Sequence, residues 1–272
     1  MKSKSDSQIE NTTYTFCMFC GSRKYRTVLK RQDFAILSCK ECQIAKTQPP
    51  PTLPDYEEMD FHFRENEVEF IQPKDLPEDW QRSISIQEKM ITDHLPKGSK
   101  ITEIGCGEGL FLNELQKHGF RTFGIEPSVS AAKRGATRGI GINRGYFPVV
   151  KPDELQDLFI LSHVLEHIEE PVSFIDAISE KLKPGGYILL AQTNYRGFIP
   201  RLQKEKWYAW VPEHHYWHFT LNGLTTLMEK KKFKRKDYKY SSLVHKHDLQ
   251  YKIAEWKESW IDQFIVLFKK EE

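Results

Sequence analysis

A glycine-rich turn between two apolar segments constrains this chain more than any other feature of its sequence. The stretch Ile101–Phe111 predicts a buried strand, a turn that contains Gly105, Gly107 and Gly109, and the start of a helix. Because glycine has no Cβ, the backbone of such a turn can lie directly against a ligand. The next apolar segment ends in Glu126, nineteen positions after Gly107, where an acid can accept hydrogen bonds from both hydroxyls of a ribose.

The order of strand, glycine turn, helix, strand and acid predicts a nucleoside-containing cofactor on a Rossmann-like sheet. A dinucleotide fingerprint requires a small residue at the sixth position of its glycine motif, where this chain has Leu110. Glu103 precedes the first glycine by two residues, and an acid there would repel a pyrophosphate but suits a cationic ligand. S-adenosylmethionine is such a ligand, since it carries a sulfonium and an ammonium group and no phosphate. The pattern Glu-x-Gly-x-Gly-x-Gly resembles the first motif of the class I S-adenosylmethionine-dependent methyltransferases.

Further segments resemble the same family in the same order. Asp157–Ile168 is similar to its fourth-strand segment, in a version that ends in Leu-Glu-His. Leu182–Gly186, followed by the apolar run Tyr187–Gln192, is similar to its turn into the fifth strand. The resemblance covers roughly Ile84 to Val244, and it implies a methyl-transferring enzyme whose sheet closes with an antiparallel hairpin.

The resemblance also implies roles for individual residues. Glu103 would bind the methionine end of the cofactor through its ammonium group, and Glu126 would bind the ribose hydroxyls. Pro127 or Ser128 would border the adenine, whereas Cys106 is interpreted as a packing residue rather than a nucleophile. The predicted cofactor-binding residues are Glu103, Gly105, Cys106, Gly107, Gly109, Glu126, Pro127 and Ser162.

One feature of the family has no counterpart in this chain. The family often has an acid after its third strand that contacts the adenine amine, whereas Ile142–Phe147 contains no acid. Asn143 or a backbone carbonyl would have to make that contact instead.

Strand and helix patterns alternate from Lys100 to Gln192, which predicts a parallel sheet with helices on both faces. With the hairpin that the resemblance implies, the predicted fold is an α/β, Rossmann-like, mostly parallel seven-stranded sheet. Further elements are predicted outside the alternating region. They are helices at Trp80–Leu95, Leu221–Lys232 and Asp248–Trp260, and strands at Phe233–Ser241 and Asp262–Phe268.

Changes in composition divide the chain of 272 residues into four predicted parts. Residues 1–11 form a disordered leader, 12–54 a zinc-binding module with a proline-rich end, 55–79 a connector, and 80–272 the catalytic domain. Within that domain, residues from about 195 to 220 form an aromatic cap, because they carry three Trp and three His but few aliphatic side chains. The aromatic rings would either stack on an acceptor or form the core of the cap itself.

Two Cys-x-x-Cys pairs, Cys17 with Cys20 and Cys39 with Cys42, are separated by eighteen residues. Each pair places two thiolates on one tight turn, so the four together predict a closed, structural zinc site in a small zinc-ribbon-like module. Two redox or disulfide pairs are the alternative. Together with the catalytic motifs, the module resembles that of bacterial methyltransferases of surface-polysaccharide, modified-sugar and natural-product pathways. That resemblance implies that the module packs beside the acceptor site.

Four histidines are candidate catalytic residues, because histidine is the usual general base near neutral pH. His163 and His167 follow the fourth predicted strand, where the active-site mouth of an open α/β sheet lies. His214 and His215 lie in the aromatic cap and would act as a base or as acceptor ligands. The alternative for His167 is structural, at a helix start capped by Glu166. A second metal ion at the cap is not favoured, because its histidines lack a good ligand spacing.

Charge and hydropathy limit the partners that this chain can have. The formal net charge is +2, which does not indicate a dedicated nucleic-acid binder, and no apolar run reaches the length of a membrane span. The cysteine pairs, without a secretion signal, predict a reducing, cytoplasmic location. The predicted partner is a small-molecule acceptor, such as a sugar, a nucleotide-linked sugar or another pathway intermediate.

Two alternative functions remain open from the sequence. RNA methylation is the runner-up, because zinc modules before such domains can grip RNA. The module is not strongly basic, but a patch of basic residues, offset only partly by Asp33 and Glu41, keeps this alternative open. A non-catalytic cofactor-binding protein that retains the fold is the third alternative. The basic residues of the patch are Arg23, Lys24, Arg26, Lys30 and Arg31.

Overall fold

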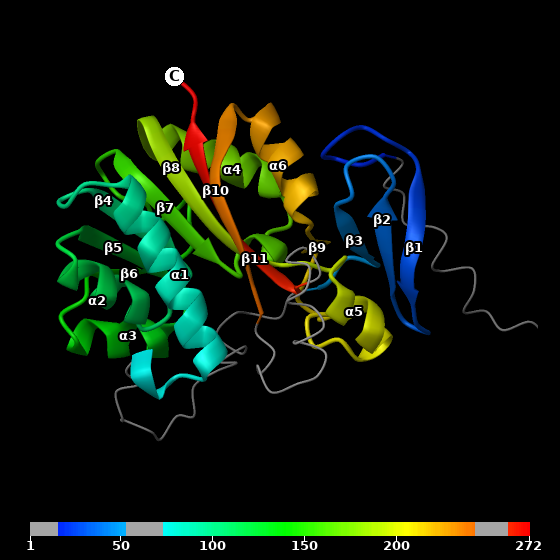
Figure 1. The fold of residues 1–272 in the computed structure, drawn as a ribbon, viewed down its shortest axis with the longest axis horizontal. Helices are drawn as coiled ribbons and strands as arrows, with labels where there is room; N and C mark the ends of the chain where they lie inside the picture. Colours follow the sequence, from blue (N-terminus) through cyan, green and yellow to red (C-terminus); the bar gives the residue numbers. More distant parts are fainter. Residues whose placement is uncertain (1–15, 53–72, 243–260) are drawn as a thin grey trace, which may run out of the picture.

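The computed structural model describes residues 16–52, 73–242 and 261–272. Its larger sheet consists, in spatial order, of β10 (Phe233–Ser241), β11 (Gln263–Lys270), β8 (Leu182–Thr193), β7 (Gln156–Ser162), β4 (Lys100–Ile104), β5 (Arg121–Glu126) and β6 (Ile142–Arg144) (Figure 1). The last five strands of this order run parallel to one another. Strand β11 lies antiparallel between β8 and β10. The predicted seven-stranded, mostly parallel sheet with an antiparallel closing pair is confirmed.

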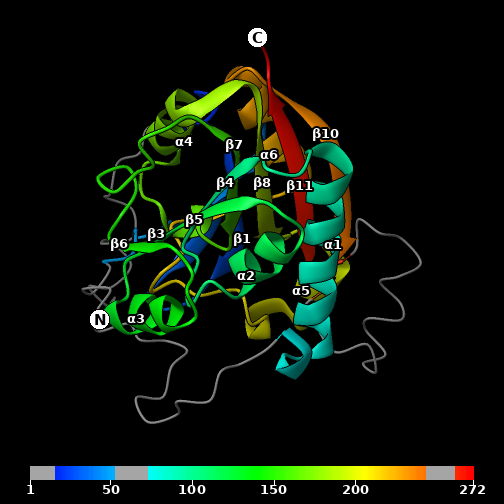
Figure 2. The same cartoon turned by 90° about the vertical axis from the view of Figure 1, so that its left-hand side faces the viewer.

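Helices cover both faces of this sheet (Figure 2): α1 (Glu78–His94) and α2 (Leu110–Lys117) on one face, and α4 (Pro171–Lys181) and α6 (Leu221–Lys230) on the other. The apolar side chains of β7 alternate between these two layers. Leu158 and Ile160 pack on the side of α1 and α2, whereas Phe159 and Leu161 pack on the side of α4 and α6. A strand that is buried on both faces requires such a continuous apolar run.

Local sequence explains where two further boundaries fall. Helix α3 (Val129–Thr137) begins after Ser128, whose hydroxyl accepts a hydrogen bond from the backbone N–H of Ala131 at 3.2 Å. Helix α6 ends at Lys230, before the predicted end at Lys232, because Lys232 has a φ of 61°, which an α-helix does not allow.

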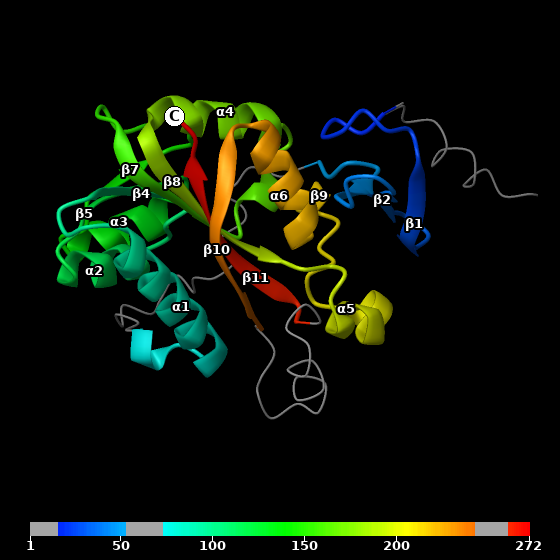
Figure 3. The same cartoon turned by 45° about the horizontal axis from the view of Figure 1, so that its top comes forward.

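A second, four-stranded sheet carries the two Cys-x-x-Cys pairs and lies beside the larger sheet (Figure 3). Its antiparallel strands are, in order, β1 (Tyr25–Lys30), β2 (Ala35–Cys39), β3 (Ala45–Gln48) and β9 (Trp217–His218). The strand β9 comes from the aromatic cap, where Trp217 pairs with Lys46 and His218 pairs with Ala45. The cap and the cysteine module therefore share one sheet.

Several aromatic side chains of the cap form core. Trp207 is 2% exposed and packs in the same cluster as Ile36 of β2. The ring centroids of Phe19 and Trp217 lie 4.8 Å apart, edge to face. For Trp207 and Trp217, core packing is the alternative that the structure supports. The remaining cap elements are α5 (Phe198–Gln203) and the 3-10 helix η3 (Lys204–Lys206).

Three predicted segments fall outside the described residues. They are the leader at 1–11, the helix at Asp248–Trp260 and most of the connector at 55–79, of which the 3-10 helix η1 (Pro73–Asp75) is described. Within the described ranges, no helix has both the length and the apolar character needed to cross a membrane.

Candidate cofactor and acceptor sites

The glycine turn joins β4 to α2 at the carboxyl edge of the parallel sheet. Gly105 and Gly109 have φ angles of +70° and +72°, a backbone region that favours glycine. A Cβ at Gly105 would lie 2.8 Å from Cγ2 of Val164, and a Cβ at Gly109 would lie 2.9 Å from Cγ2 of Ile140. Only glycine therefore allows the turn to approach the segment after β7, and allows α2 to begin so close to the segment before β6.

Glu126 at the end of β5 connects the glycine turn to the start of α3. Its Oε2 accepts a hydrogen bond from the backbone N–H of Gly107 at 2.8 Å, and its Oε1 accepts one from the backbone N–H of Ser128 at 2.8 Å. The residue is 3% exposed. These two hydrogen bonds hold the carboxylate between the glycine turn and the start of α3.

Glu103 lies on β4, two residues before the first glycine of this turn. It is 5% exposed, and its Oε2 has no hydrogen-bond partner in the described part of the chain. Burial, together with the negative charge of Glu126, raises the pKa of Glu103 to about 8. An unpaired carboxyl in such a place is unfavourable, so this acid fits a ligand that brings a positive charge.

The other predicted cofactor-binding residues surround these two acids. The thiol of Cys106 is buried, and burial raises its pKa far above the usual range, which agrees with a packing role. Pro127 follows β5 and is partly buried. Ser162 ends β7, and its hydroxyl donates to Oε1 of Gln87 on α1 at 2.9 Å. The link from Ser162 to α1 has no signal in the sequence, because the two residues are 75 positions apart.

Glu166 organises the histidines that follow β7. It lies in the 3-10 helix η2 (Leu165–His167), is 2% exposed, and makes no side-chain cap. Its Oε1 lies 3.4 Å from Nδ1 of His163. The amide nitrogen of Gln263 on β11 donates to Nε2 of His163 at 3.1 Å, so the proton of His163 is on Nδ1 and faces Glu166. Both nitrogens of His163 are thereby occupied.

His167 and His215 adopt a different arrangement. Nδ1 of His167 donates to the backbone carbonyl of His214 at 3.1 Å, and Nδ1 of His215 donates to the carbonyl of Ala209 at 3.2 Å. Because a carbonyl only accepts, each ring has its lone pair on Nε2. The two ring centroids lie 4.7 Å apart. The structure thus brings together two predicted candidates that are distant in sequence.

Burial affects the charge of these groups. Although burial alone would raise it, the hydrogen bond from His163 and the neighbouring histidine charges hold the pKa of Glu166 well below its usual range. Burial lowers the pKa of His215 to about 4, and burial also lowers the pKa of His214. At neutral pH the cluster therefore contains a carboxylate and a neutral His215.

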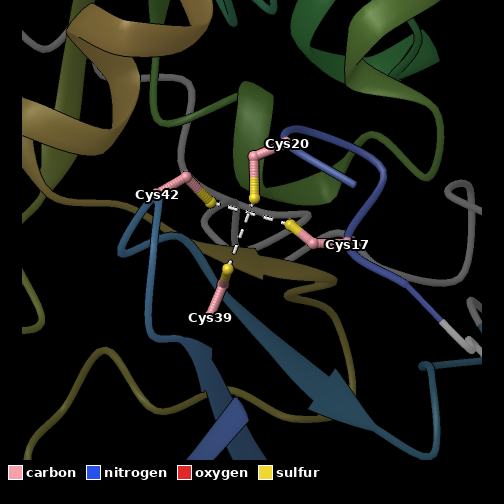
Figure 4. Close-up of side chains that lie close together, drawn as sticks. All are labelled: Cys17, Cys20, Cys39 and Cys42. Carbon is pink, nitrogen blue, oxygen red and sulfur yellow. Dashed lines mark hydrogen bonds between the residues drawn. The ribbon is translucent and has the colours of Figure 1, made fainter. Parts of the chain in front are cut away.

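The four cysteines of the two Cys-x-x-Cys pairs converge (Figure 4), with Sγ atoms 3.6 Å apart for Cys17 and Cys42 and 3.5 Å apart for Cys20 and Cys39. Thiolates around a tetrahedral zinc ion with bonds of about 2.3 Å are roughly 3.8 Å apart. All four Sγ atoms lie within 4.8 Å of one another. The arrangement fits a closed four-thiolate metal site.

Known proteins resemble this chain over part of its length. Among the curated relatives, a ubiquinone biosynthesis O-methyltransferase from Caulobacter vibrioides is 30% identical to this chain over 106 residues. The match covers 36% of this chain and 42% of that protein. A protein of the same name from Nitrobacter winogradskyi is 30% identical over 149 residues, covering 47% of this chain and 57% of its own length. The chain thus matches about half the length of these relatives.

Solved structures share the fold at low identity. A SAM-dependent methyltransferase from Archaeoglobus fulgidus superposes with a TM-score of 0.54 at 16% identity, covering 70% of this chain and 94% of that one. The N-methyltransferase NodS from Bradyrhizobium japonicum, in complex with S-adenosyl-L-homocysteine, gives 0.53 at 18% identity, with 76% and 96% covered. The family model described as "Methyltransferase domain" matches residues 75–234. Because that match covers more than half of the chain, the chain belongs to the methyltransferase domain family.

Proposed function

We propose that the protein transfers a methyl group from S-adenosylmethionine to a hydroxyl-bearing small molecule. The observation that carries this proposal is the buried carboxyl of Glu103, whose Oε2 is unpartnered among the described residues and lies beside a glycine turn. When bound, S-adenosylmethionine supplies an electrophilic methyl group on a sulfonium and a cationic amino group. An unpaired acid and a turn without Cβ atoms suit that ligand.

Each residue of the cofactor site has a proposed role. Glu103 binds the ammonium group. Glu126 binds the ribose hydroxyls while it continues to accept from Gly107 and Ser128. The other members contribute backbone surface, adenine contact or close packing. They are Gly105, Cys106, Gly107, Gly109, Pro127 and Ser162.

We place the acceptor at the cluster of His163, His167, His214 and His215. In-line displacement at the methyl carbon requires the acceptor oxygen in contact with that carbon and the removal of its proton. Nε2 of His167 is the proposed base, because this ring is only partly buried and its Nδ1 is held by a carbonyl. His215, with a pKa lowered to about 4, is a weak base at neutral pH and serves better as a hydrogen-bond acceptor.

The proposed acceptor is a sugar, a nucleotide-linked sugar or another intermediate of a bacterial surface-polysaccharide, modified-sugar or natural-product pathway. The O-methyltransferase names of the curated relatives support an oxygen acceptor. Trp210 and Tyr216 of the cap are partly exposed, and they are the aromatic residues on which we propose that a sugar stacks. The proposal includes a structural zinc ion at the four cysteines, the four-part division of the chain, and a cytoplasmic location.

Titration of the purified full-length protein with S-adenosylhomocysteine, with zinc quantified in the same sample, tests the proposal. Micromolar binding is the expected result, followed by methyl transfer to members of a panel of nucleotide sugars and phenols. A folded protein that fails to bind S-adenosylhomocysteine would contradict the cofactor assignment and favour a non-catalytic role.

Glu103 makes the affinity for S-adenosylhomocysteine dependent on pH. Its pKa in the free protein is raised to about 8, and a bound ammonium group stabilises the ionised carboxylate. Binding therefore releases a proton below pH 8, so the affinity should rise by about tenfold per pH unit towards pH 8 and then level off. Calorimetry from pH 6 to 9 measures this slope. The Glu103→Gln variant should bind more weakly and without the slope; the same slope in that variant would assign it to another group.

His167→Ala should reduce turnover by about 10²–10⁴-fold, the usual contribution of a general base. The affinity for S-adenosylhomocysteine should change by less than about twofold, because His167 is not part of the glycine turn. The release of S-adenosylhomocysteine with an acceptor from the panel is the readout. His118→Ala, which removes an exposed histidine paired with Glu88, is the matched control. Unaltered turnover in His167→Ala would leave this residue with a structural role.

RNA methylation is the second candidate, and one observation favours it. Strand β1 forms an edge of the smaller sheet, and the five basic residues of the patch are all exposed. Structured RNA whose binding weakens steeply with salt would support this candidate. Charged side chains also protect an edge strand from pairing with other chains, which explains the patch without RNA.

A further inference from the structure

Glu166, His167 and His215 form a cluster of possible metal ligands outside the cysteine module. One ligand atom from each residue lies within 4.8 Å of the other two. His167 directly follows Glu166 on η2, whereas His215 lies in the cap, 48 positions further along the chain. The spacing of the cap histidines does not indicate a metal site, because the other two ligands come from the segment after β7.

Hydrogen bonds donated by Nδ1 fix the imidazoles of His167 and His215 in the neutral form that binds metal ions. Nδ1 of His167 donates to the carbonyl of His214, and Nδ1 of His215 donates to the carbonyl of Ala209. Each ring therefore carries its proton on Nδ1 and has a lone pair on Nε2 that can bind a metal ion. Histidine ligands of metal ions usually have such a donor interaction from the second ring nitrogen.

Glu166 supplies the carboxylate ligand, which is also held in place by a neighbouring side chain. Its Oε1 faces the protonated Nδ1 of His163, which is itself held by Gln263. Its Oε2 is buried and has no hydrogen-bond partner among the residues that the structure describes. A buried carboxylate oxygen without a partner is unfavourable, and a cation at this position would remove that cost.

We propose that Glu166, His167 and His215 bind a divalent first-row transition metal ion beside the acceptor position. Two imidazoles and one carboxylate form a ligand set that such ions bind with open coordination positions. Around a tetrahedral ion with bonds of about 2.1 Å, ligand atoms are roughly 3.4 Å apart. The ligand atoms, which lie within 4.8 Å of one another, would move closer to reach that spacing.

The site deepens the proposed function, and its chemistry differs from that of an imidazole base. An ion held by three protein ligands retains positions for water or for an acceptor hydroxyl, whose pKa it lowers. In the metal-bound form, Nε2 of His167 would bind the ion instead of acting as the base, Nε2 of His215 would bind it too, and the proton of the acidified acceptor hydroxyl would pass to solvent water. Activation of the acceptor by the ion rests on the proposed methyl transfer, whereas metal binding itself can be measured without it.

The experiment uses the full-length protein with zinc retained at the cysteines after mild chelation. Titration with Co²⁺ should show a second bound equivalent whose absorption lacks thiolate-to-metal charge transfer, which distinguishes it from exchange at the cysteine cluster. His167→Ala, at the least buried of the three positions, and His215→Ala should each weaken this second equivalent by at least about 100-fold. His118→Ala should bind it as the unchanged protein does.

The outcomes separate this inference from the proposed function. A protein that binds cobalt only in place of zinc, or whose second equivalent survives in both His167→Ala and His215→Ala, overturns the metal site. Affinity for S-adenosylhomocysteine is measured on every variant and should remain within about twofold, which also shows that each variant is folded. If the protein without substitutions does not bind S-adenosylhomocysteine, the proposed cofactor is wrong, and the cobalt titration still tests the metal site independently.

Discussion

Cys20→Ser is expected to lower the zinc content from one ion per chain to none and to destabilise the whole cysteine module. Structural zinc contributes about 10–16 kcal/mol in zinc-finger peptides, so its loss should destabilise the module although Ile36 and Ala45 pack in a core shared with the cap. Metal analysis and thermal unfolding followed by circular dichroism are the measurements. Cys106→Ser is the matched control, because it removes a buried thiol outside the cluster and should keep the zinc.

The loss of zinc should extend into the cap, because the module and the cap share contacts. Trp217 pairs with Lys46 in the small sheet and packs against Phe19, which lies between two of the cysteines. Lys230 on α6 donates to the carbonyl of Phe19 at 2.9 Å. Turnover of Cys20→Ser should therefore fall, while the glycine turn still binds S-adenosylhomocysteine. If the protein without substitutions is folded but contains no zinc, the assignment of the cysteine module as a zinc site is wrong.

Glu126→Ala should weaken binding of S-adenosylhomocysteine by on the order of 2 kcal/mol, or about 30-fold. The substitution removes the charge-assisted acceptor proposed for the ribose, and it also frees the backbone N–H groups of Gly107 and Ser128. Calorimetric titration at one pH measures the change. Glu126→Gln keeps one acceptor oxygen and should lose less.

The control for this prediction is Glu114→Ala on α2. Glu114 is also an acid close to the glycine turn in sequence, but it pairs with Lys117 at 2.7 Å rather than with the turn. It should leave the affinity unchanged. If Glu126→Ala binds S-adenosylhomocysteine as well as the unchanged protein does, the ribose assignment is wrong.

Local patterns in the sequence determined the larger sheet. Runs such as Leu158–Leu161 have no polar residue, because a central parallel strand is buried on both faces. The glycines of the turn and the acids Glu103 and Glu126 could also be identified from the sequence. Each of them lies at the end of a strand, within a short motif that can be read without knowledge of distant residues. Each Cys-x-x-Cys pair likewise predicts, within four residues, a tight turn that carries two metal ligands.

Only the tertiary structure decided which distant residues meet. Trp217 completes the sheet of the cysteine module, and Trp207 belongs to a shared core, although an aromatic segment alone is equally consistent with an acceptor pocket. Glu166, which the sequence suggested as a helix cap, instead lies buried between His163 and the cap histidines. Contacts of this kind depend on packing between elements, and the periodicity of a single element carries no information about them.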